Sequence, residues 1–231
     1  MYKQKYSKGE KSVRSNYTFH NSKHHDNKLS HVDCIRFTSI DPGVVNFAIR
    51  IEDRYSNGII KPLLFQLISL ENYPNPYIRL NEIFKQIYNL LLNTHVFIIE
   101  EQLGVNNSCV RISQHVISYL IHEFDNTELQ PIICEIKATE KTKKLGCPKV
   151  KGKPDKFNKR WCEKKAKELL EIRGDYKSIN IINKQRDKRG KKKQDDLSDI
   201  VCQIEAYCVN FNLLLTVYKS RPKINIITIK R

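Results

Sequence analysis

The chain has 231 residues, a hydrophobic share of 40% and a formal net charge of +16. This length and apolar content suit one packed domain with a tail. No stretch approaches the roughly 18 consecutive apolar residues of a membrane span, so we expect no membrane partner. So positive a charge favours a polyanionic partner, most commonly nucleic acid, although a lysine-rich coding bias would produce the same excess.

Both the N-terminal segment and the cysteines indicate an intracellular protein. Residues 1–33 are polar and basic, without the apolar stretch of a secretory signal, and we expect them to form a disordered basic arm. Four histidines lie in this arm, for which a solvated tail is the favoured interpretation over a metal site. The seven cysteines include no Cys-x-x-Cys pair, which predicts reduced thiols rather than disulfides or a zinc site.

Strand patterns dominate the chain directly after the arm. Residues 35–40 alternate as a strand and end in an Asp-Pro-Gly turn. Residues 44–51 and 63–70 predict two more strands, with the hairpin signal Asn-Gly at 57–58 between them. The sequence therefore predicts three successive strands before the first helix.

Helices and strands alternate in the rest of the chain. Helical spacing of apolar residues covers 76–91, 108–124 and 161–172, and a last helix is predicted from about 195 to 214. Short apolar runs at 96–99 and 131–136 predict a fourth and a fifth strand. Two lysine-rich segments, 137–160 and 184–194, are predicted to be basic loops. The order predicts an α/β core with a mixed five-stranded sheet flanked by helices.

Acidic residues stand at the ends of predicted elements. Asp41 ends the first strand and Glu100 the fourth, while Asp196 and Asp199 share one face of the last helix. A carboxylate at the end of a buried strand is costly unless it is paired or binds a metal. Oxygen ligands of this kind suit Mg²⁺ or Mn²⁺, and a pair of ions can cleave a phosphodiester. Each acid alone also fits a bland interpretation: a turn residue, a solvated strand end or a helix N-terminal acid.

Three segments together resemble the motifs of RuvC-like Holliday-junction resolvases, in the form found in poxviruses and other large DNA viruses. They are Ser39-Ile40-Asp41-Pro42-Gly43, Ile98-Ile99-Glu100-Glu101-Gln102 and Lys193-Gln194-Asp195-Asp196-Leu197-Ser198-Asp199. The resemblance covers about residues 34–215 and leaves a C-terminal tail, 216–231, that is a possible edge strand. It implies a ribonuclease H-like fold.

The resemblance also implies a site and a reaction. Asp41, Glu100, Asp196 and Asp199 would bind two Mg²⁺ or Mn²⁺ ions, with Asp195 as a spare acid. Asn158-Lys159-Arg160 resembles a basic motif, so Lys159 would lie near the scissile phosphate, a role that Lys137 or Lys143 would otherwise take. The implied enzyme is a homodimeric endonuclease that resolves four-way DNA junctions, in an infected cell or a virion if viral and otherwise in the nucleus.

Two alternatives remain open from the sequence. The same fold also serves nucleases acting on other branched DNA, on RNA–DNA hybrids or on transposon ends. A binding protein without catalysis is the other alternative, but such a protein gains nothing from a carboxylate cluster near phosphate.

Overall fold

A mixed β-sheet forms the centre of the molecule. The computed structural model describes residues 17–20, 29, 32–150, 152, 154–186, 190 and 192–213. In this part of the chain the strands follow the order β1-β6-β5-β2-β3-β4. The prediction of an α/β core built on a mixed sheet is confirmed. The predicted C-terminal tail, 216–231, lies outside the described residues.

Three of the strands form the predicted meander. They are β2 (Cys34–Asp41), β3 (Phe47–Tyr55) and β4 (Ile60–Ile68), paired antiparallel. The hairpin between β3 and β4 turns at Gly58, whose φ of 87° favours glycine. The Asn57 side chain supports this turn by accepting a hydrogen bond from the Ile59 amide at 3.0 Å.

Two strands extend the sheet beside β2 by parallel pairing. They are β5 (Val96–Glu100), which pairs with β2, and β6 (Ile132–Ile136), which pairs with β5. Both are short apolar runs that are almost fully buried, as expected for strands covered on both faces. The carboxyl ends of β2 and β5 therefore lie side by side, which brings the residues at those ends together.

A sixth short strand corrects the prediction for the N-terminal arm. β1 (Tyr17–Phe19) pairs antiparallel with β6, so disorder does not hold for these residues. His20, next in the chain, lies 2.9 Å from a Glu135 carboxylate oxygen. The sequence does not predict β1 because three residues are too few to show the alternation of a strand.

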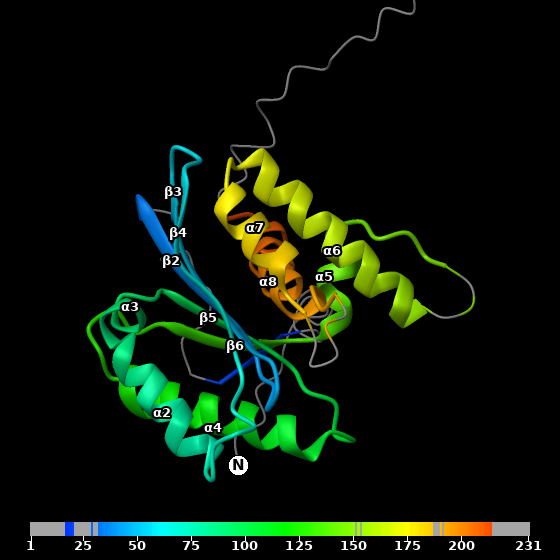
Figure 1. The fold of residues 1–231 in the computed structure, drawn as a ribbon. Coiled ribbons are helices and arrows are strands. Elements are labelled where there is room, and N and C mark those ends of the chain that lie inside the picture. The colour runs from blue at the N-terminus through cyan, green and yellow to red at the C-terminus, as the bar shows by residue number, and fades with distance from the viewer. Residues whose placement is uncertain are drawn as a thin grey trace, which may run out of the picture.

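Helices cover both faces of the sheet (Figure 1). One face carries α2 (Pro76–Gln86), α3 (Tyr88–Leu92) and α4 (Asn107–Phe124), packed on an apolar core with the inner residues of β2, β3 and β5. The other face carries α5 (Ala138–Lys144), α6 (Pro154–Ile172), α7 (Tyr176–Lys184) and α8 (Asp195–Asn210). No helix in the described ranges is long and apolar enough to cross a membrane.

The lysine-rich segment 137–160 contains more helix than predicted. It holds α5 and the start of α6, where the sequence predicts a loop. Helix α7 (Tyr176–Lys184), which follows α6, was not predicted either. Lysine is a good helix former, so a basic composition does not exclude a helix.

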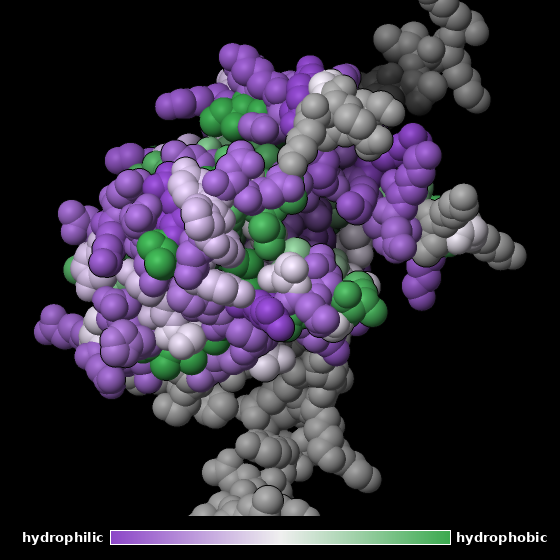
Figure 2. Space-filling model, turned by 60° about the horizontal axis from the view of Figure 1, so that its bottom comes forward, coloured by the Kyte–Doolittle hydropathy of each residue, from purple (hydrophilic) through white to green (hydrophobic). Residues whose placement is uncertain are grey.

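Figure 2 shows that hydrophilic residues dominate the face in view, with hydrophobic residues in small separate patches.

Candidate metal centre

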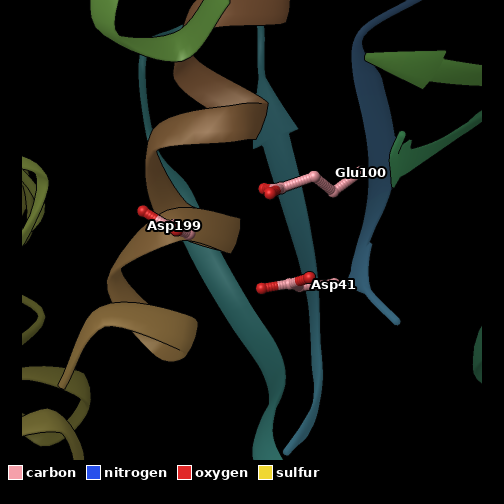
Figure 3. Close-up of side chains that lie close together, drawn as sticks. All are labelled: Asp41, Glu100 and Asp199. Atoms are coloured by element: carbon pink, nitrogen blue, oxygen red, sulfur yellow. The ribbon is translucent and has the colours of Figure 1, made fainter. Parts of the chain in front are cut away.

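Three carboxylates meet where two strands of the sheet face helix α8. Asp41 is the last residue of β2, Glu100 is the last residue of β5, and Asp199 lies on α8. One ligand oxygen from each lies within 4.8 Å of the others. Asp41 and Glu100 extend from the sheet toward the helix that carries Asp199 (Figure 3). Side chains alternate between the two faces of a strand, so Asp41 and Glu100 share the face that α8 covers. Asp199 lies on the side of α8 that faces them.

The turn after Asp41 requires a glycine. A Cβ atom at Gly43 would lie 2.5 Å from the Asn46 carbonyl oxygen, closer than side chains tolerate. Gly43 therefore lets the chain fold back directly behind Asp41 and enter β3. The Asp-Pro-Gly signal in the sequence thus has a steric basis in the turn that fixes the first carboxylate.

A buried glutamine of α8 orients Glu100. Gln203 is fully buried, and its Nε2 donates to Glu100 Oε2 at 2.6 Å. Its Oε1 accepts from the Ser39 hydroxyl on β2 at 2.8 Å. Gln203 therefore links the two strands that supply the carboxylates. No pattern in the sequence predicts this role for Gln203, since periodicity identifies the apolar face of a helix but not a buried amide on it.

Lys141 contacts the carboxylates directly. Its Nζ lies 2.6 Å from Glu100 Oε2 and 2.8 Å from Asp199 Oδ2. The lysine belongs to α5, which follows β6 and packs against α8, so its side chain is buried. The sequence predicts a basic loop at this position and indicates Lys159, with Lys137 or Lys143 as alternatives, as the lysine of the site. One of many lysines in a basic segment carries no local signal of burial.

Burial makes the charge state of this group depend on its neighbours. Desolvation and the Glu100 carboxylate raise the pKa of Asp41 well above its ordinary value. Desolvation also raises the pKa of Asp199 to about 6, against the lowering effect of Lys141. Desolvation alone would lower the pKa of Lys141, but Asp199 and Glu100 raise it well above its usual range. An additional cation is thus electrostatically favoured beside the carboxylates.

The donor set fits a hard divalent cation. All three groups offer carboxylate oxygens, the ligands that Mg²⁺ and Mn²⁺ prefer. Asp199 Oδ1 is buried and accepts no hydrogen bond from the described residues. A buried carboxylate oxygen without a donor is costly, and a bound cation would compensate it.

The other predicted site residues form an adjacent group of ion pairs. Asp196 does not belong to the triad; it pairs with Lys193 at 3.1 Å. Asp195, the predicted spare acid, binds Lys193 at 2.7 Å and Lys159 at 2.8 Å. Lys159 therefore contacts Asp195 rather than the triad, and its side chain is 59% exposed. These lysines lower the pKa of Asp195 to about 2, although burial opposes them.

The chain is similar to two proteins of invertebrate iridescent viruses. No protein-family model matches the chain. Uncharacterized protein 97L of Invertebrate iridescent virus 3 is 34% identical over 112 residues, covering 48% of this chain and 46% of that protein. Uncharacterized protein 170L of Invertebrate iridescent virus 6 is 28% identical over 128 residues, covering 49% and 50%. The chain thus matches about half the length of these curated relatives.

Two solved structures resemble the fold of the chain. The yeast mitochondrial Holliday junction resolvase Ydc2 has a TM-score of 0.52 and 14% identity, over 78% of this chain and 80% of the resolvase. RuvC of T. thermophilus, in complex with a Holliday junction substrate, has a TM-score of 0.50 and 11% identity, over 78% and 96%. The fold is ribonuclease H-like. At these identities the likeness establishes the fold alone, while the acidic triad is an observation on this chain.

Proposed function

We propose that the protein is a metal-dependent endonuclease that resolves four-way DNA junctions. The observation that carries this proposal is the convergence of Asp41, Glu100 and Asp199 within a RuvC-like fold. Carboxylates at adjacent strand ends, opposed by a helix, would form a cation site, and the Glu100 and Asp199 side chains are not fully buried, at 13% and 14% exposed. One structural neighbour is a Holliday junction resolvase and the other is RuvC in complex with a Holliday junction, which favours branched DNA as the substrate class.

The roles of the residues follow from their contacts. Asp41, Glu100 and Asp199 would hold Mg²⁺ or Mn²⁺, which when bound supplies an activated water and neutralises phosphate charge. Asp196, three residues before Asp199 on α8, pairs with Lys193, so we do not assign it to the metal. Lys141 adds a fixed positive charge where charge develops on the phosphate. We therefore assign to Lys141 the role expected of Lys159, whose exposed amine suits contact with the DNA backbone.

Basic residues near this site would hold the DNA. Lys156, Lys159 and Arg160 are exposed on the first turns of α6. Lys159 pairs with Asp195 at the start of α8, so these turns lie close to the helix that carries Asp199. The net charge of +16 supplies a wider positive field for phosphates.

A symmetric junction presents two equivalent cuts, which a homodimer matches with two equivalent sites. The proposal therefore includes a dimer on the DNA. All seven cysteines are free thiols, which fits a reducing compartment such as the interior of an infected cell. The curated relatives are proteins of viruses.

Substrate preference tests the proposal. Labelled four-way junction, flap, linear duplex and RNA–DNA hybrid are incubated with the full chain, with Mg²⁺, with Mn²⁺ and with EDTA. We expect metal-dependent, paired cuts in opposite strands of the junction and little cleavage of duplex. Preferential cleavage of the flap or hybrid would move the function to another substrate, and binding without cleavage in any metal would contradict an enzyme.

Salt should weaken junction binding steeply. Each phosphate contact made by a basic side chain releases counterions, so log K falls by about 0.9 per contact per log unit of salt on duplex DNA. Fluorescence anisotropy with EDTA present, at several salt concentrations, measures the slope. Alanine at Lys156 and Arg160 together should flatten it by about two contacts. A flat slope in the wild-type protein would contradict the use of its positive charge for phosphate contact.

A further inference from the structure

The carboxylate triad already contains one cation, the ammonium group of Lys141. Its Nζ contacts Glu100 Oε2 and Asp199 Oδ2 at 2.6 and 2.8 Å. The Lys141 side chain is only 6% exposed, so water cannot compensate the charge and the two carboxylates must do so. Helix α5 therefore brings a buried positive charge into the site.

The hydrogen bonds at Glu100 leave one of its oxygens unavailable to a metal ion. Oε2 accepts from Lys141 Nζ and from Gln203 Nε2, each at 2.6 Å. A carboxylate offers about two acceptor positions on each oxygen, so the two donors fill both positions of Oε2. The Ser39 hydroxyl holds Gln203 in this orientation from the other side.

Asp199 divides its two oxygens in a similar way. Oδ2 faces Lys141, whereas the buried Oδ1 has no hydrogen-bond donor in the described part of the chain. One oxygen of Asp199 is thus engaged by the lysine, and the other remains for a metal. Two metal ions about 3.5–4 Å apart would need shared carboxylates and many more oxygen ligands than this set leaves.

The charge balance of the site also favours a single divalent ion. Asp41, Glu100 and Asp199 carry three negative charges when ionised, and Lys141 cancels one. One divalent cation would balance the two negative charges that remain. The neighbouring Asp195 and Asp196 do not change this balance, because Lys159 and Lys193 pair with them. A second divalent ion would leave excess positive charge in a buried site.

We propose that the metal centre of the free protein takes one divalent ion and that the Lys141 ammonium replaces a second one. This replaces the expectation of two ions per site. In nucleases with two ions, one of them stabilises the leaving oxygen. Here Lys141 supplies that charge, and Gln203 fixes the carboxylate that holds the lysine. The inference rests on the proposed nuclease site, but it concerns metal binding in the absence of DNA.

The stoichiometry of Mn²⁺ binding tests this inference. Calorimetry on the full chain, together with electron paramagnetic resonance of unbound Mn²⁺, counts ions without any measurement of activity. We expect one ion per chain for the wild-type protein. Lys141→Met removes the charge but keeps the length of the side chain, so a second ion should bind and the Kd of the first should fall about tenfold. Lys143→Met is the matched control, since Lys143 lies on the same helix with its side chain 67% exposed, and should bind one ion.

Two results would overturn the inference. One is binding of two ions to the wild-type protein with comparable affinity; the other is a folded Lys141→Met protein with wild-type stoichiometry and affinity. Circular dichroism verifies folding, and if the methionine variant does not fold, Lys141→Gln and the wild-type count decide. A wild-type protein that binds no Mn²⁺ would instead remove the metal centre and the proposed function with it.

Discussion

Asp199→Asn is expected to abolish DNA cleavage while junction binding survives. The substitution keeps the shape of the side chain but removes a negative ligand from the triad and leaves Lys141 with one carboxylate fewer. Loss of a preorganised electrostatic contact at such a site costs on the order of a thousandfold in rate. Removal of a negative charge near phosphate should leave affinity for DNA unchanged or increase it. Single-turnover cleavage at saturating protein and anisotropy in EDTA separate the two effects.

The control for this experiment is another aspartate without a metal role. Asp155 is exposed in the first turn of α6, so Asp155→Asn makes the same charge change away from the triad. We expect the control to cut at the wild-type rate. Equal loss of binding and cleavage in a folded Asp199→Asn protein would show a structural role for Asp199 and contradict the metal assignment.

Most of the fold and two strand-end carboxylates were predictable because they follow from short-range rules. Alternation along 35–40 and the apolar run before Glu100 give strands, and adjacent parallel strands end at one edge of a sheet. The helical spacing of Asp196 and Asp199 predicted one shared face, yet the structure brings only Asp199 into the triad. Asp196 instead pairs with Lys193, three residues earlier in the chain.

Lys141 and Gln203 escaped prediction for a related reason. Both are polar residues in helices, where a period of 3.6 indicates the buried face only through apolar residues. Their burial depends on long-range packing of α5 against α8 and of α8 against β2 and β5. Functional polar residues are the ones that break the apolar pattern, so local sequence rules fail where the site is built.

A second group of buried charges ties the sheet to the helices behind the site. The Arg50 side chain on β3 has no exposed surface and donates to Glu52 at 2.5 Å, to Asp175 at 3.0 Å and to the Ser178 hydroxyl at 3.1 Å. Arg54 continues the group by donating to Glu52 and to Glu205 of α8. These contacts join β3 to the start of α7 and to α8, the helix that carries Asp199.

Arg50→Met should therefore destabilise the protein strongly. It leaves the fully buried Glu52 with one cation fewer and removes the ion pair of Asp175, and breaking a buried pair in this way costs about 3–5 kcal/mol. The contribution of Glu52 should depend on pH. The arginines lower its pKa despite burial, so the stabilisation is present above the ordinary carboxyl pKa and is lost as pH falls below it. Urea unfolding at neutral pH measures the loss, with Lys165→Met as control because its pair with Glu168 lies at the surface and should contribute at most about 1 kcal/mol. An Arg50→Met protein as stable as this control would show that the buried charges do not hold the helices of the site to the sheet.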